Sequence, residues 1–218
     1  MDLSRGKFIV VEGIDGCGKG SAVAAIKKRF PNFITSREPG GTPLAEAQRN
    51  ILLSPIGSMM TAEQQMDTFM CARRIHLIDK VYPALLEGIS VITDRFDAST
   101  FAYQKVLTTF DECHDDINQV LFDKFFQLRE VVVTRKPDMY IFLDVDEEEG
   151  MRRRALDRNQ ESNHFDLASI VEQKRRRRAY QIFFSRTEDS YTRYVTIDAN
   201  QQKHRVAQDV LTEVQSLF

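Results

Sequence analysis

The sequence predicts an α/β fold in which a parallel β-sheet is covered by helices on both faces. Short apolar, β-branched runs alternate with longer segments of helical spacing along the whole chain, which is the pattern of such a sheet. The first apolar run also ends in a glycine-rich turn that leads into a helix, as a buried parallel strand would. Because 218 residues lie within the range that one hydrophobic core serves, we expect a single domain, 1–218.

The first half of the chain is expected to hold two strands and three helices. Residues 7–12 (KFIVVE) have strand composition, and the helix after their glycine-rich turn is expected at 19–30. A second apolar run, 32–36, stops at the turn-rich segment EPGGTP, after which 44–53 has helical spacing. A long helical segment, 61–87, ends at a glycine.

The second half continues this alternation to its end. The runs ISVIT and MYIFL have the composition of buried strands, and a last strand precedes an amphipathic helix. The expected strands are 89–93, 139–143 and 194–197. The expected helices are 99–107, 116–133, 147–154, 167–186 and 204–217. Residues 156–166 are polar, and we expect them to be irregular.

The composition excludes several classes of protein. With 42% hydrophobic and 28% charged residues and a net charge of −2, the chain has too little positive charge for a general nucleic-acid binder. No apolar run approaches the length that crosses a bilayer, so we expect no membrane partner. The three cysteines, Cys17, Cys71 and Cys113, are far apart and indicate neither a disulfide framework nor a zinc site. A reducing, cytoplasmic setting is expected.

The strongest chemical signal is the segment 13–19 (GIDGCGK), directly after the first expected strand. Glycines at this spacing let backbone N–H groups point at phosphate oxygens, and the following helix N-terminus adds partial positive charge. Lys19 supplies a cation for the β- and γ-phosphates. This phosphate-binding loop, or P-loop, predicts an ATP site. Its expected residues are Gly13, Ile14, Asp15, Gly16, Cys17, Gly18, Lys19, Gly20 and Ser21.

One position departs from the usual P-loop pattern. The pattern has Ser or Thr after the lysine, where its hydroxyl binds Mg²⁺, but this chain has Gly20 there and a hydroxyl only at Ser21. One helical position turns a side chain by about 100°. We therefore expect Mg²⁺ to depend on nucleotide phosphates, water and the carboxylates of Asp15 and Asp94. The alternative is an inactive nucleotide-binding protein.

Two further segments lie at the distance from the P-loop that is typical of one protein family. They are 36–46 (SREPGGTPLAE) and 94–96 (DRF) followed by 99–104 (STFAYQ), and both resemble signatures of bacterial thymidylate kinases. The resemblance extends from about residue 8 to residue 180. It implies a P-loop fold, a short arginine-bearing lid, transfer of the γ-phosphoryl group of ATP to dTMP, and a homodimer packed through long helices. A kinase for dUMP or for a modified pyrimidine deoxynucleotide is the alternative.

The residues expected to bind the acceptor nucleotide include an aromatic ring and an arginine on one helix face. Phe69 and Arg73 are four residues apart, so the ring could stack on a base while the guanidinium reaches polar atoms nearby. Core packing is the alternative for Phe69 and for Tyr180. The resemblance implies that Tyr103 selects deoxyribose. The residues that it places at the acceptor are Asp15, Arg37, Phe69, Arg73, Arg95, Thr100, Tyr103, Gln104 and Tyr180.

Arginines after the fourth expected strand predict the lid, at about 152–166. Arginines that close over a triphosphate neutralise charge and exclude water, and the resemblance implies that one of them is catalytic. We favour Arg153 and Arg158. The residues expected to take part in phosphoryl transfer are Lys19, Asp94, Arg95, Arg153 and Arg158.

Two other features suggest less. The basic run 175–178 lies on an expected helix, where consecutive residues point in different directions, so it predicts one or two inward arginines and no nucleic-acid patch. His76 is expected to be a helix histidine with satisfied hydrogen bonds and no chemical role.

Overall fold

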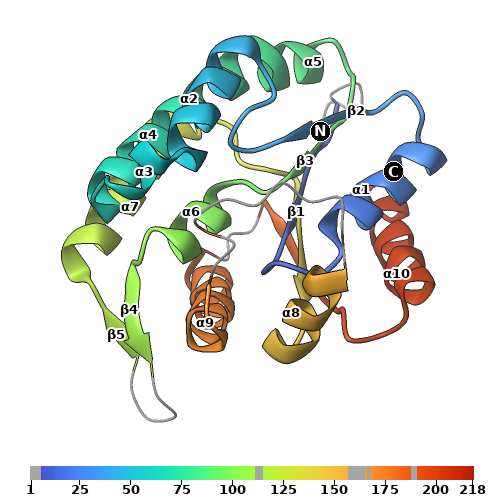
Figure 1. Ribbon diagram of the computed structural model, residues 1–218. Helices are drawn as coiled ribbons and strands as arrows, with labels where there is room; N and C mark the ends of the chain where they lie inside the picture. Colours follow the sequence, from blue (N-terminus) through green and yellow to red (C-terminus); the bar gives the residue numbers. More distant parts are fainter. Residues whose placement is uncertain (1–5, 111–114, 157–164, 166–167, 188–190) are drawn as a thin grey trace.

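Five parallel strands form the central sheet, in the order β2-β3-β1-β6-β7. The computed structural model describes residues 6–110, 115–156, 165, 168–187 and 191–218 (Figure 1). The strands are β1 (Phe8–Glu12), β2 (Ile34–Arg37), β3 (Val91–Asp94), β6 (Met139–Asp144) and β7 (Arg193–Asp198). Each overlaps a strand expected from the sequence, and all four pairings are parallel. The predicted α/β fold is therefore confirmed.

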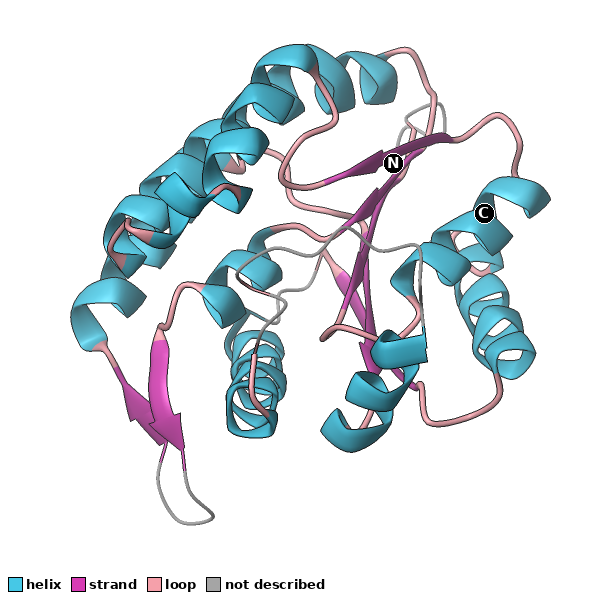
Figure 2. Ribbon diagram, in the orientation of Figure 1, coloured by secondary structure: helices cyan, strands magenta, loops and turns pink. Residues whose placement is uncertain are grey.

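Helices cover both faces of this sheet (Figure 2). They are α1 (Lys19–Arg29), α2 (Pro43–Leu53), α3 (Pro55–Ser58), α4 (Ala62–His76), α5 (Tyr82–Leu86), α6 (Asp97–Tyr103), α7 (Gln119–Val132), α8 (Glu147–Leu156), α9 (Ile170–Thr187) and α10 (Lys203–Gln215). On one face α1 packs against α10, whereas α6 packs against α7 and α9 on the other (Figure 1). No helix among the described residues combines the length and apolar composition that a bilayer-spanning segment requires.

The helix expected at 61–87 is divided into three consecutive segments. α4 is followed by one π-helical segment, η1 (Leu77–Val81), and then by α5. Pro83 has no N–H group with which to continue the α-helical pattern of hydrogen bonds, and a π-helical turn is one way for a helix to accommodate such a break. The helical region was predicted, but its internal change of pitch was not.

The helix expected at 99–107 is wrong at its carboxyl end. α6 stops at Tyr103, and Lys105 has a left-handed backbone with φ of 55°, which a continuing right-handed helix does not allow. The chain then forms β4 (Leu107–Phe110), which pairs antiparallel with β5 (Asp115–Ile117). These strands are too short for hydrophobic periodicity to distinguish them from the ends of helices.

The sheet brings the site residues together at the carboxyl ends of its strands. β1 is buried along its whole length and leads directly into the P-loop. Asp94, at the end of β3, is in register with Val11 of β1 and with Arg37 of β2. Three strands therefore end at one level, where ligands of open α/β sheets bind.

The P-loop packs backbone against backbone on the start of α8. Gly16 has φ of 79°, and a Cβ atom on it would lie 2.0 Å from the carbonyl oxygen of Gly150. A Cβ on Gly150 would in turn lie 2.7 Å from the carbonyl oxygen of Asp15. Two glycines facing each other thus set the distance between the phosphate-binding loop and α8.

We expect Gly16→Ala to destabilise the protein and Gly20→Ala not to. Alanine at position 16 would need a left-handed backbone, which costs about 1–3 kcal/mol, and would also push α8 away. A Cβ on Gly20 meets no atom within 4 Å, so this helical Gly→Ala change should be neutral or stabilising by about 0.5–1 kcal/mol. Urea unfolding without nucleotide measures both. Equal effects of the two substitutions would contradict the packing described.

Candidate active site

A cavity of about 1260 Å³ opens at the carboxyl ends of the strands. Its walls come from the P-loop, the ends of β2 and β3, and the helices α4, α6 and α8. This exceeds the usual volume of a pocket for one small ligand, about 300–1,000 Å³. The cavity is therefore large enough for two nucleotides side by side.

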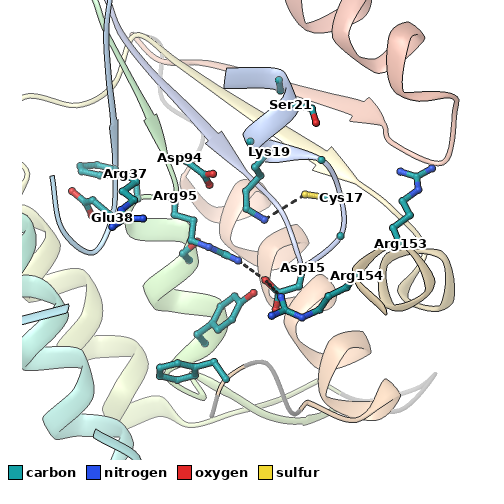
Figure 3. A pocket seen from close by; sticks show the side chains of 18 of the residues that line it. Asp15, Cys17, Lys19, Ser21, Arg37, Glu38, Asp94, Arg95, Arg153 and Arg154 are labelled. Atoms are coloured by element: carbon teal, nitrogen blue, oxygen red, sulfur yellow. Dashed lines mark hydrogen bonds and ion pairs between the residues drawn. The ribbon is translucent and has the colours of Figure 1, made fainter. Parts of the chain in front are cut away.

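Lys19 lies across the P-loop and is buried. Its Nζ atom donates to the carbonyl oxygens of Gly13 and Ile14, both at 2.9 Å, and approaches Cys17 Sγ at 3.5 Å. The preceding Gly18 has φ of 98° and caps α1. The amino group thus lies inside the loop that was expected to bind phosphate. The Ser21 side chain points away from the Lys19 amino group (Figure 3), as the helical turn of about 100° per residue predicts.

Three arginines from separate elements converge on Asp15, which is 7% exposed. Its carboxylate lies 2.5 Å from Arg95 Nη2 and 3.7 Å from Arg154 Nη1 (Figure 3). It also lies 3.5 Å from Arg176 Nη1. Burial alone would raise the pKa of Asp15, but the charges of Arg95, Lys19, Arg176 and Arg154 outweigh burial and hold this pKa well below its usual range.

This arrangement makes Asp15 a poor metal ligand. Both carboxylate oxygens already face guanidinium groups, and a cation would have to enter among positive charges. The same arrangement leaves a surplus of positive charge beside the cavity, which favours an anion. The expectation that Asp15 holds the metal is therefore not supported by its surroundings.

The backbone of Arg95 is left-handed, and its side chain is held from several directions. It has φ of 69°, and its N–H group donates to the carbonyl oxygen of Val11 at 2.9 Å. Its Nη1 atom lies 3.3 Å from Ser99 Oγ and 3.4 Å from the hydroxyl of Tyr180. These contacts direct the guanidinium across the cavity toward Asp15.

Arg73 is buried between a carboxylate and a hydroxyl. Its Nε atom donates to Glu38 Oε2 at 2.8 Å, and its Nη2 atom donates to Thr100 Oγ1 at 2.9 Å. Glu38 also contacts His76 Nδ1 at 2.9 Å, and His76 Nε2 lies 2.7 Å from Ser36 Oγ. The expectation of a satisfied histidine at position 76 is confirmed, and its partners orient the Arg73 side chain.

Most of the expected acceptor residues do line one cavity. Phe69 is half-buried, and its ring centroid lies 6.3 Å from that of Phe165, which lies 6.1 Å from Tyr103. Phe69 thus belongs to the cavity wall and not to the core. The expected acceptor residues that line the cavity are Asp15, Arg37, Phe69, Arg73, Arg95, Thr100 and Tyr103.

Two expected acceptor residues do not line the cavity. Gln104 is fully buried, and its amide atoms have no hydrogen-bond partner among the described residues. Tyr180 is fully buried and stacks on Phe142 with ring centroids 5.4 Å apart. Its hydroxyl lies 2.8 Å from Ser99 Oγ. The core alternative holds for Tyr180, whose hydroxyl supports Arg95 from behind.

Two neighbouring arginines of α8, Arg153 and Arg154, have different partners. Arg153 pairs with Glu149 at 2.6 Å and donates to the carbonyl oxygen of Ala199 at 2.7 Å, so it faces away from Asp15 (Figure 3). Arg154 is the α8 arginine that reaches the P-loop. One residue of register, about 100° on a helix, separates the two. Both line the cavity, and the catalytic role expected of Arg153 stays a prediction. Arg158 lies outside the described residues.

Glu12 connects the P-loop strand to the start of α6 and was not expected at the site. Its carboxylate is fully buried and accepts hydrogen bonds from the backbone N–H groups of Phe96 at 2.7 Å and Ser99 at 3.1 Å. It also accepts from Ser99 Oγ at 2.7 Å. Burial raises the pKa of Glu12 to about 7. The only feature of the sequence that could have indicated this role is the position of a glutamate between a buried strand and a glycine-rich turn.

A P-loop at the end of a parallel sheet, with an arginine-rich, aromatic-walled pocket beside it, defines a phosphotransferase that acts on nucleotides. Comparison with known proteins identifies the family. The thymidylate kinase family model matches residues 11–210. The chain is 34% identical to thymidylate kinase of Ligilactobacillus salivarius (strain UCC118) over 214 residues, covering 95% of this chain and 97% of the relative.

A solved structure agrees. The crystal structure of thymidylate kinase from Ehrlichia chaffeensis superposes with a TM-score of 0.68 at 25% identity, covering 96% of this chain and 99% of the other. The chain belongs to the thymidylate kinase family. Its activity is the ATP-dependent phosphorylation of dTMP to dTDP.

Glu12→Gln is expected to change the pH dependence of stability. Between the ordinary pKa of 4.5 and the folded value of about 7, folded Glu12 holds more protons than the unfolded chain, so the free energy of unfolding falls as pH rises. The fall amounts to at most about 3 kcal/mol. Glutamine cannot ionise and keeps an oxygen for the backbone donors, so the variant should lack this component. Urea unfolding from about pH 5 to about pH 8 measures it. Parallel curves for the two proteins would contradict it.

Proposed function

We propose that ATP and dTMP bind side by side in this cavity, with phosphoryl transfer taking place next to Lys19, Arg95 and Arg154. One observation supports this most: four cationic side chains from different elements meet beside Asp15, where the P-loop joins the aromatic pocket. The ATP triphosphate would lie along 13–21, the dTMP base would stack on Phe69, and the deoxyribose would lie between Asp15 and Tyr103, all of which line the cavity.

The acceptor side is proposed to combine stacking with directed hydrogen bonds. Phe69 offers a ring to the base, and Arg73 and Thr100, already bonded to each other, offer donors and an acceptor to its edge. Arg37 is 56% exposed at its side chain and pairs with Glu46 at 3.4 Å, so it is available for the acceptor phosphate. Gln104 would act from behind this wall.

The chemical step needs charge neutralisation more than proton transfer. The acceptor phosphate is the nucleophile and has no proton that must be removed at neutral pH, so no general base is required. Lys19, Arg95 and Arg154 would stabilise the negative charge of the transferring group, and Arg153 would act on the donor side through the 199–201 segment that it contacts.

Mg²⁺ is proposed to be held chiefly by the nucleotide phosphates, by water and by Asp94. Asp94 Oδ1 is buried and has no hydrogen-bond partner among the described residues, and the space around Gly20 admits water. Among the described residues no cluster of three or more His, Cys, Asp or Glu side chains forms a dedicated metal cage. Few protein ligands and several waters suit Mg²⁺, which neutralises phosphate charge when bound.

The chain is further proposed to act as one kinase domain in the cytoplasm. Cys17 and Cys71 are free thiols, which suits a reducing compartment.

A homodimer is proposed through the face formed by α2, α3 and η1, where apolar side chains are exposed: Leu44 at 64%, Ile51 at 47%, Ile56 at 66% and Ile78 at 54%. Adjacent exposed apolar side chains are typical of interaction surfaces.

Selective formation of dTDP is the expected result of an acceptor panel. ADP release is measured with ATP and Mg²⁺ against dTMP, dUMP, dCMP, dGMP, dAMP and UMP, with product identity confirmed. Turnover should stop when EDTA removes the metal, because phosphate charge is then left unneutralised. Preferential use of dUMP would support the alternative acceptor. Bound ATP without any diphosphate product would contradict the enzyme and favour a binding protein.

Ile51→Glu is expected to shift the protein from dimer to monomer. A carboxylate buried on the proposed face would lack a partner across the interface. Val171→Glu is the matched control, because Val171 is equally apolar and 67% exposed on α9, outside that face. Sedimentation velocity gives the mass of each. A monomeric wild-type chain, or dissociation caused by both changes, would contradict the proposed surface.

A further inference from the structure

The basic run on α9 places its four arginines in four different surroundings. Arg175 is buried and donates to the carbonyl oxygens of Leu107 at 2.6 Å and Ala102 at 3.0 Å, which joins β4 and α6 to α9. Arg177 pairs with Asp144 at 2.5 Å, and Arg178 is exposed. Arg176 alone among the four reaches Asp15. The expectation of one or two inward arginines is confirmed.

Arg176 contacts three parts of the acceptor cavity at once and is 4% exposed. Its Nη1 atom lies 3.0 Å from the carbonyl oxygen of Phe165 and 3.5 Å from Asp15 Oδ2. Its guanidinium carbon lies 4.1 Å from the ring centroid of Tyr103. Glu172, one helical turn earlier, accepts from Nε at 3.3 Å. One planar group therefore connects the P-loop, α6 and the start of α9.

The position of the Tyr103 ring depends on its contacts with two arginines. Its hydroxyl is buried and has no hydrogen-bond partner among the described residues, so no hydrogen bond there directs the side chain. The ring is instead contacted by Arg176 at 4.1 Å and by Arg95 at 4.9 Å. Guanidinium groups stack well on aromatic faces, and this attraction strengthens in a site from which water is excluded.

We propose that Arg176 is a specificity-determining residue, which holds the Tyr103 ring at the distance from Asp15 that admits a 2′-deoxyribose and leaves no room for a 2′-hydroxyl. This inference rests on the proposed function, in which Tyr103 faces the acceptor sugar. Arg176 acts through Tyr103, so it is a positioning residue. Its removal would let the ring move and would widen the sugar site.

The test compares substitutions at three arginines of the same run. Arg176→Met keeps an unbranched, flexible side chain but removes the guanidinium with its charge and plane, and Arg176→Lys keeps the charge on an aliphatic stem without the plane. Arg178→Met is the control for losing a charge on α9, and Arg175→Met is the control for losing a buried structural arginine. Steady-state kcat and KM are measured for dTMP, for thymine ribonucleoside monophosphate and for ATP. Thermal unfolding is recorded for every variant.

For Arg176→Met we expect the preference for dTMP over the ribonucleotide to fall about tenfold, as loss of a buried guanidinium–ring contact would give. The KM for ATP should stay within about twofold of wild type, since the donor site keeps Lys19. Arg176→Lys should not restore the preference, because an ammonium group has no plane to stack on the ring. Arg175→Met should lower stability while leaving the preference unchanged, and Arg178→Met should change neither.

The outcomes separate this inference from the function on which it rests. If wild type uses both acceptors equally well, the proposed role of Tyr103 at the sugar fails. If wild type prefers dTMP over the ribonucleotide and Tyr103→Ala does not, the role of Tyr103 at the sugar stands. If, in that case, Arg176→Met and Arg176→Lys both keep the wild-type preference for dTMP, the role of Arg176 is overturned. Full recovery in Arg176→Lys alone would also overturn it, because charge and not stacking would then be sufficient.

Discussion

The arrangement of the active site depends on the ion pairs of the Asp15 carboxylate. Arg95 follows β3, Arg154 belongs to α8 and Arg176 to α9, and all three approach this one buried group. Without a counter-charge, cations so close together in a site with little water would repel one another strongly. One carboxylate offsets only part of the positive charge. The remainder is available to neutralise phosphate groups, which is what transfer between two nucleotides requires.

A second buried carboxylate holds this arrangement from behind. Glu12 joins the end of β1 to the backbone of α6, and through Ser99 it contacts Tyr180. Ser99 and Tyr180 in turn support the guanidinium of Arg95. Since Glu12 immediately precedes the P-loop, the donor loop and the acceptor arginine share one hydrogen-bonded base. A shift in either would be transmitted to the other through these side chains.

On the other side of the acceptor pocket, a buried carboxylate again orients an arginine. Glu38, at the end of β2, contacts both Arg73 and His76 of α4, so a loop residue of the 36–46 segment orients a helix arginine far away in sequence. Gly41 permits this approach, because a Cβ there would lie 2.4 Å from Ser36 Oγ and 2.9 Å from the His76 ring. Gly41 is therefore a steric requirement of the site.

The sequence by itself determined the α/β fold, the P-loop, the family and most of the cavity wall. These follow from local patterns: hydrophobic period, glycine spacing and motif order depend on neighbours along the chain. The tertiary structure decided which of several equivalent side chains faces the site. Arg154 and not Arg153 approaches Asp15, Arg176 and not Arg175 contacts Tyr103, and Tyr180 supports the site from the core. The exact rotation of each helix about its axis follows from long-range packing, and one residue of register turns an arginine by about 100°.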